Sequence, residues 1–184
     1  MGSEQHSANA AETQERQLEW DGLIFDIRRS IRYHSRRAAF FGSFVKLLTA
    51  VSMLAGFGVA GSVISDSKTL SLILGIAVGL ASSVSLAFGF SFREQTHIDL
   101  KRKFADLEKS MVRQEKPDEK TLRERIADRL AIETDEPAVV RTLDIVCHNE
   151  LVRAQGYGKL AKIGWLRSLL CQIDLPWLKP ELEA

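Results

Sequence analysis

The stretch Cys147-His148-Asn149-Glu150 holds the side chains of this chain that are best suited to chemistry. Cysteine, histidine and a carboxylate are the components of a thiol nucleophile with its base, and also of a zinc site. Adjacent residues on a helix point about 100° apart, so Cys147 and His148 would not face each other, and Cys171 offers at most one more ligand. We therefore expect no catalysis and no metal, with Cys147 in an apolar stripe and its three neighbours as polar packing residues. A thiol enzyme that uses Cys147 is kept as an alternative.

Two uncharged apolar runs, Leu47 to Ile64 and Thr69 to Phe92, dominate the sequence between Phe40 and Phe92. Runs of about 18 to 25 apolar residues match the bilayer core of roughly 30 Å. Because only Ser65 to Lys68 separate them, the sequence predicts two membrane-spanning helices, at about 40–64 and 69–92, that return as an antiparallel hairpin. A pair of buried helices in a soluble protein is the disfavoured alternative, since such helices usually carry a polar face.

Basic residues stand on the outer flanks of both runs, whereas the short connection has one lysine and one aspartate. Positive residues near the ends of spans stay cytoplasmic. We therefore expect a multi-pass membrane protein with both termini in the cytoplasm. The flanking arginines are candidates for contact with anionic lipid head groups. They are Arg28, Arg29, Arg32, Arg36, Arg37 and Arg93.

Composition limits the other functions. The net charge of +1 and the mean hydropathy of −0.07 average an apolar hairpin with polar flanks. The basic residues gather at the membrane margins rather than over a whole face, so we expect no nucleic-acid partner. The sequence contains no glycine-rich phosphate loop and no nucleophile elbow, and we expect no cofactor.

Along the chain, residues 1–17 are polar and lack periodicity, and they are expected to form a disordered tail. Residues 18–116 would hold an amphipathic leading helix, the hairpin and an exit helix that continues straight beyond Phe92. Residues 117–184 would form a cytoplasmic helical region. Its predicted helices are marked by Leu122 to Leu130, by a start at Thr134 to Pro137, and by roughly Lys159 to Gln172. The fold class is thus an all-α membrane protein.

Helical stripes support this division. Apolar residues recur every three or four positions in the leading and exit helices, so these two helices are expected to pair as a stalk. They are Trp20, Leu23, Ile24, Ile27 and Ile31 in the first and Ile98, Phe104, Leu107 and Met111 in the second. Trp20 and Tyr33 would lie at head-group level, and His34 is expected to be a solvated interfacial residue rather than a titrating sensor.

The polar residues inside the spans are candidates for a pore lining. Ser82, Ser83 and Ser85 form a cluster in the middle of the second span, and Lys46 is the one charged residue of the first. Lys46 is more simply explained by snorkelling to the cytoplasmic interface. A ring of Lys46 side chains at the mouth of an oligomeric pore is the alternative.

Small residues are abundant in both spans. At 100° per residue, Gly75, Gly79, Ser82 and Gly89 fall within an arc of roughly 80°. Small residues let helix backbones approach closely in lipid. This arc therefore predicts a face that packs between copies in a homo-oligomer, although packing within one hairpin would account for some of it.

The layout resembles that of the SLATT proteins, the two-transmembrane effectors of bacterial conflict systems. The resemblance rests on the leading helix with Trp20, Arg28, His34 and Arg37, the tight Ser65 to Lys68 connection, and the helices that follow, over about Leu18 to Leu170. It implies a membrane effector that oligomerises and permeabilises the cytoplasmic membrane in an anti-phage response, alongside a cytoplasmic sensor or nucleotide-signalling partner. A two-span anchor that docks a cytoplasmic partner, without pore activity, is the alternative function.

Overall fold

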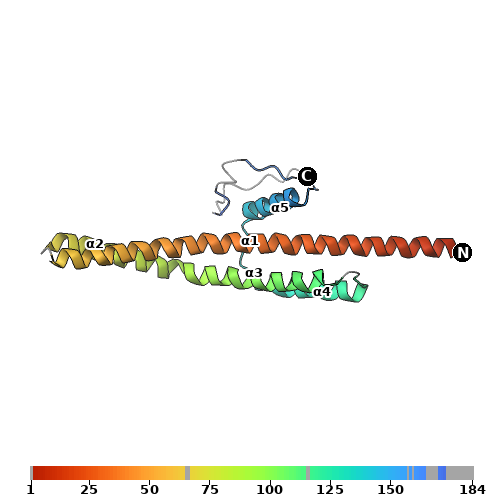
Figure 1. The fold of residues 1–184 in the computed structure, drawn as a ribbon, viewed down its shortest axis with the longest axis horizontal. Coiled ribbons are helices and arrows are strands. Elements are labelled where there is room, and N and C mark those ends of the chain that lie inside the picture. Colours follow the sequence, from red (N-terminus) through yellow and green to blue (C-terminus); the bar gives the residue numbers. More distant parts are fainter. Residues whose placement is uncertain are drawn as a thin grey trace. The chain divides into compact units, whose positions relative to one another are not determined.

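The computed structural model describes residues 2–64, 67–114, 117–156, 158, 160–164 and 170–172. Over these residues the protein is all-helical, with five helices and no strand. The helices are α1 (Gly2–Ile64), α2 (Lys68–Phe88), α3 (Phe90–Val112), α4 (Glu119–Glu133) and α5 (Arg141–Gln155) (Figure 1). Helices α1 and α2 contain segments that are long and apolar enough to cross a membrane.

The chain divides into two compact units. Residues 36–98 form the hairpin unit, which holds the apolar part of α1, all of α2 and the start of α3. Residues 1–35 and 99–184 form the bundle unit, which holds the start of α1, the rest of α3, and α4 and α5.

The bundle unit has a core between α1, α3 and α4. Phe104 and Met111 of α3 and Ile27 of α1 are fully buried there, and Leu122 joins them from α4. The predicted pairing of the two apolar stripes is thereby confirmed. Trp20 and Tyr33 differ from the prediction, because Trp20 lies in this core and Tyr33 is buried in a second cluster. Their rings cover apolar neighbours inside the bundle instead of a lipid surface.

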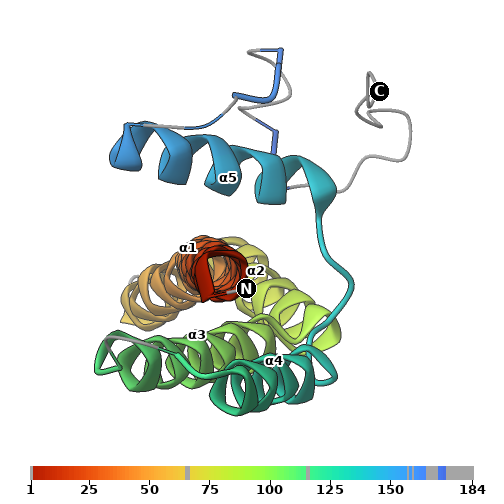
Figure 2. The same ribbon diagram turned by 90° about the vertical axis from the view of Figure 1, so that its right-hand side faces the viewer.

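The second cluster attaches α5. Leu143 and Cys147 of α5 pack with Tyr33 of α1, and Val140 and Cys171 complete the cluster. As a result α5 lies on the side of α1 opposite to α3 and α4 (Figures 1 and 2). The predicted apolar stripe of this helix is confirmed.

Ion pairs connect the helices of the bundle unit. Arg28 of α1 contacts Glu108 of α3 at 2.7 Å, and Arg129 of α4 contacts Asp26 of α1 at 2.8 Å. Arg29 reaches Asp144 of α5 at 3.2 Å. Each of these pairs is only partly shielded from water, so each adds little to the free energy of unfolding. Their main effect is to determine which helix faces meet.

The start of the chain differs from the expected disordered tail, because residues 2–17 continue α1 as helix. The segment is rich in alanine, glutamate and glutamine, which are good helix formers. Extending an existing helix also avoids the cost of nucleation. Thr13 donates to the Asn9 carbonyl oxygen at 2.8 Å, and Arg16 contacts Glu12 at 3.4 Å.

The sequence predicted that the exit helix would continue straight from the second apolar run. The structure corrects this prediction, because α2 and α3 are separate helices. Gly89 ends α2 with φ 58° and ψ 38°, and α3 begins at Phe90. This left-handed conformation is strained for any residue with a Cβ atom. The Gly89 N–H donates to the carbonyl oxygens of Ser85 and Leu86, which closes the end of α2.

Helix α4 begins as predicted after Pro117. The Asp118 side chain accepts the N–H of Thr121 at 2.9 Å, which caps the helix. Hydrogen bonds from the Thr121 side chain and backbone hold the pKa of this carboxyl below its ordinary value. The cap is therefore complete at neutral pH and is lost only when acid protonates Asp118.

The connection from α4 to α5 corrects the predicted helix start at Thr134 to Pro137. Residues 136–140 have no regular secondary structure, and α5 begins at Arg141. Side chains of α1 hold this connection, since His34 Nε2 lies 3.0 Å from Glu136 Oε1 and the Tyr33 hydroxyl accepts the Val140 N–H at 3.0 Å. These long-range contacts outweigh the local preference for a helix.

The predicted helix at Lys159 to Gln172 is also corrected in part. Residues 160–164 are not helical. Asn149 of α5 binds both backbone polar groups of Ala161, and these bonds replace helical ones. Lys159, Trp165 and Leu166 belong to the rest of that prediction and lie outside the described residues, as do Ser65 and Asp66 of the predicted connection.

Candidate functional site

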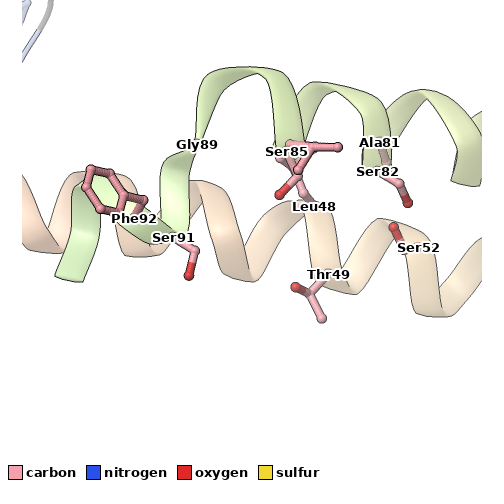
Figure 3. A pocket seen from close by; sticks show the side chains of 10 residues that line it. Leu48, Thr49, Ser52, Ala81, Ser82, Ser85, Gly89, Ser91 and Phe92 are labelled. Atoms are coloured by element: carbon pink, nitrogen blue, oxygen red, sulfur yellow. The ribbon is translucent and has the colours of Figure 1, made fainter. Parts of the chain in front are cut away.

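A groove lined by hydroxyl groups lies on the hairpin unit and has a volume of about 540 Å³ (Figure 3). Helices α1, α2 and α3 and the Gly89 break all contribute to it. We call it the hydroxyl groove. Its lining consists of Leu48, Thr49, Ser52, Ala81, Ser82, Ser85, Leu86, Gly89, Ser91 and Phe92.

Helical spacing places these hydroxyls together. Thr49 and Ser52 are three residues apart on α1, as are Ser82 and Ser85 on α2, so each pair shares one helix face. Ser52 and Ser82 point toward one another from the two helices (Figure 3). The Thr49 hydroxyl donates to the Val45 carbonyl oxygen at 2.8 Å, which leaves its oxygen lone pairs as acceptors toward the groove.

The Gly89 break completes one end of the groove. The chain turns at Gly89 and brings Ser91 and Phe92 of α3 to the same side as Ser85. In a straight helix Phe92, seven residues after Ser85, would share its face, whereas Ser91 would lie about 120° away from it. The break therefore adds a further hydroxyl to the groove.

Small residues form the contact between α1 and α2. Ala55 of α1 and Ala81 of α2 are buried, at 7% exposure each. At Gly58, a Cβ atom would lie 2.7 Å from Cδ1 of Leu74, so the Leu74 side chain of α2 packs against this glycine and would have to move if a larger residue replaced it. The contact is narrow, and most of each span is left outside it.

Gly75 and Gly79 lie outside this contact. A Cβ atom built at either position would meet no other atom within 4 Å, and both residues are exposed. These two glycines therefore take no part in the contact between α1 and α2 within one chain. The four residues predicted to pack between copies thus lie in different surroundings. Gly75 and Gly79 are exposed, Ser82 lines the hydroxyl groove and Gly89 ends α2.

The structure also divides the predicted pore residues. Ser82 and Ser85 line the groove, whereas Ser83 and Lys46 are exposed outside it. Thr49 and Ser52 also line the groove, but they were not predicted from the sequence as pore-lining residues. The three-residue spacing of these hydroxyls within an apolar run was the available signal.

The predicted lipid-contact arginines fall into two groups. Arg28 and Arg29 are in ion pairs within the bundle unit. In the hairpin unit, the guanidinium carbons of Arg37 and Arg93 lie 4.6 Å and 5.8 Å from the ring centre of Phe41. Arg32 and Arg36 are half-exposed.

His34 differs from the expectation of a solvated residue, because its side chain is 1% exposed. Its ring stacks on Phe104 at 5.7 Å, with the ring planes 13° apart, and lies beside Glu136. His97 of the hairpin unit is also buried and stacks on Phe41 at 5.7 Å. Both histidines lie against aromatic rings inside their units.

The stretch from Cys147 to Glu150 is split between structural roles. Cys147 is fully buried in the core beside α1, and the His148 ring packs edge-on against Phe25 at 5.3 Å. Asn149 donates to the Ala161 carbonyl oxygen at 2.7 Å and accepts the Ala161 N–H at 2.8 Å. Within the described residues, no group of three His, Cys, Asp or Glu side chains is placed to hold a metal.

Comparison of the chain with family models, with curated proteins and with solved structures found no match. The hydroxyl groove is therefore interpreted from its own geometry.

Replacement of Asn149 tests its structural role. Asn149→Ala removes the acceptor of the Ala161 amide proton, at a cost of about 1 kcal/mol per neutral hydrogen bond. We expect the Ala161 amide to exchange with solvent about fivefold faster or more, measured by hydrogen–deuterium exchange. Arg153→Ala, at an exposed position of the same helix, should leave that rate unchanged. Equal rates in the two variants would contradict the assignment.

Proposed function

We propose that this protein is an effector of the bacterial cytoplasmic membrane that oligomerises and makes the membrane permeable. The hydroxyl groove carries the proposal, because it gathers five hydroxyl side chains on a hairpin that exposes many large apolar side chains. Hydroxyl groups on a surface that faces lipid are less favourable there than apolar side chains. They become favourable when they line a water-filled path.

The surface of the hairpin supports a lipid environment. Phe57 of α1 and Leu72 of α2 are 78% and 65% exposed, and Leu54 is 74% exposed. Large apolar side chains left this open would be unfavourable in water, whereas lipid tails cover them at no such cost. We place the spans in the membrane, with both termini in the cytoplasm as the flanking arginines favour.

Two spans cannot enclose an aqueous path, so the proposal requires several copies. The groove is open on one side of the hairpin, and the exposed glycines of α2 offer a surface where a second backbone can approach. Copies packed along this surface would place their grooves around one lumen. Hydroxyl groups suit such a lumen, because each can donate to an anion or accept from a hydrated cation.

Basic residues at the ends of the two apolar segments also support their placement in the membrane. Arg37 and Arg93 lie next to the phenylalanines where α1 and α3 meet the spans. Guanidinium groups in this position pair with anionic lipid head groups. The resemblance to two-transmembrane conflict effectors adds an anti-phage role and a cytoplasmic sensor or nucleotide-signalling partner to the proposal.

Serine substitutions test the groove. Ser52→Leu combined with Ser82→Leu fills the groove with apolar side chains, and we expect the depolarisation caused by the induced wild-type protein to fall by about tenfold or more. A potential-sensitive dye in growing cells measures this loss. Ser83→Leu is the matched control, since Ser83 is a neighbouring exposed serine outside the groove.

Membrane insertion of every variant is checked by fractionation, and leucine favours insertion. If the double variant depolarises cells as fully as Ser83→Leu does, the groove is not the conducting path. If the inserted wild-type protein leaves the potential intact in infected cells, and no conductance appears in planar bilayers, the anchor function replaces the pore.

A glycine substitution tests the assembly. Gly79→Leu adds a side chain at a position open within one hairpin, so the hairpin should form while a neighbouring backbone is pushed away. We expect at least a tenfold weaker oligomer, or about 1.4 kcal/mol, measured by chemical crosslinking in membranes. Leu72→Ile, at another exposed position of α2, is the control. An unchanged crosslinking ladder in Gly79→Leu would exclude this face as the contact.

A further inference from the structure

A second groove lies in the bundle unit, between the start of α1 and α4, with a volume of about 430 Å³. Glutamates line it from both helices, so we call it the acidic groove. Its lining consists of Glu12, Glu15, Arg16, Glu19, Glu119, Leu122, Arg123 and Ile126.

The acidic groove carries uncompensated negative charge. Arg16 pairs with Glu12, and Arg123 pairs with Glu119, so the two cations of the groove are neutralised locally. Glu15 and Glu19 form no ion pair with any residue that the structure describes. Two carboxylates four residues apart thus face the groove from one side of α1.

The floor of the acidic groove is apolar. Leu122 is buried beneath it, and Ile126 is 38% exposed within it. A binding segment that suits this arrangement presents an apolar side chain to Ile126, with cations on either side for Glu15 and Glu19.

Helix α3 presents such a segment on its outer surface. Ala105, Lys109, Val112 and Arg113 are all exposed, and Val112 is 60% exposed. At 100° per residue Ala105, Lys109 and Val112 lie on the side of α3 opposite to its buried residues, and Arg113 directly follows the last residue of the helix. We call these four residues the basic stripe. In the described part of the chain, neither Lys109 nor Arg113 is in an ion pair, and Asp106 lies at the edge of the stripe.

The groove and the stripe lie at the same end of the bundle unit. Trp20, which follows Glu19, and Met111, which precedes Val112, belong to one core cluster. Two bundle units placed side by side in the same orientation can therefore bring the stripe of one to the groove of the other.

We propose that the acidic groove binds the basic stripe of a second copy of this chain. The contact joins two different surfaces, so each copy offers one free groove and one free stripe. Repetition of such a contact closes into a ring when the rotation between copies allows it. This proposal rests on the proposed function in one respect: insertion in the membrane gives all copies the same orientation.

Photo-crosslinking in membranes tests the contact directly in the full chain. The photoreactive residue benzoylphenylalanine replaces Ile126 in the floor of the groove, and inverted membrane vesicles are irradiated. We expect a crosslinked dimer on a denaturing gel, with the adduct located by mass spectrometry within residues 105–113. Absence of the dimer, or an adduct on another segment, would overturn the proposal.

Charge reversal gives the second arm of the experiment. Glu15→Lys with Glu19→Lys should lower the yield of the dimer about tenfold, and so should Lys109→Glu with Arg113→Glu. The combination of all four substitutions restores opposite charges and should restore most of the yield. A combination as weak as either pair alone would contradict the assignment. Glu124→Lys with Asp128→Lys, on the opposite face of α4, is the matched control and should keep the wild-type yield.

Two further measurements keep the outcomes distinct. Glu15→Gln with Glu19→Gln replaces the reversed pair if that pair loses its helical circular dichroism, and the yield should again fall. Depolarisation is measured separately in the same strains. A dimer that forms without depolarisation supports the contact and counts against the pore, whereas depolarisation without the dimer overturns the contact alone.

Discussion

The narrow contact between α1 and α2 is the constraint on which the hairpin depends. Gly58 lets Leu74 approach α1, and Ala55 and Ala81 are buried. Because these residues are small, the two backbones can approach closely there, while most large apolar side chains of both helices remain exposed. The hydroxyls and the remaining glycines are consequently left available for other contacts. A wider apolar contact would have buried the surface that contains the hydroxyl groove.

The bundle unit is held together by different interactions. Its core is apolar, and charged pairs between the helices set which faces meet, as with Arg129 and Asp26. Its acidic groove and basic stripe are surfaces that this internal pairing leaves unneutralised. Membrane packing by small residues and charge pairing between bundles would then act on the same assembly. The first depends on close backbone approach and the second on salt concentration.

Periodicity in the sequence predicted the parts of the fold that depend on local pattern. The stripe from Trp20 to Ile31 and the stripe through Phe104 and Met111 are core residues because helical spacing alone assigns them to one face. The sequence could not place Ser52 opposite Ser82, since that placement depends on the register of two helices. It also could not bury His34, whose partner Glu136 lies 102 residues later. The break at Gly89 was missed because glycine in a membrane span is equally consistent with close packing.

In the proposed assembly, the hydroxyl groove faces water. Substituted-cysteine accessibility measures this, with Cys147 and Cys171 replaced by alanine and a single cysteine introduced at Ser82 or Ser83. A charged thiosulfonate reagent that does not enter lipid is added to cells in which the protein is active. The cysteine of Ser82→Cys should react rapidly and that of Ser83→Cys slowly, because only the first lines the groove. Equally slow reaction at both positions, in inserted and active protein, would contradict the claim.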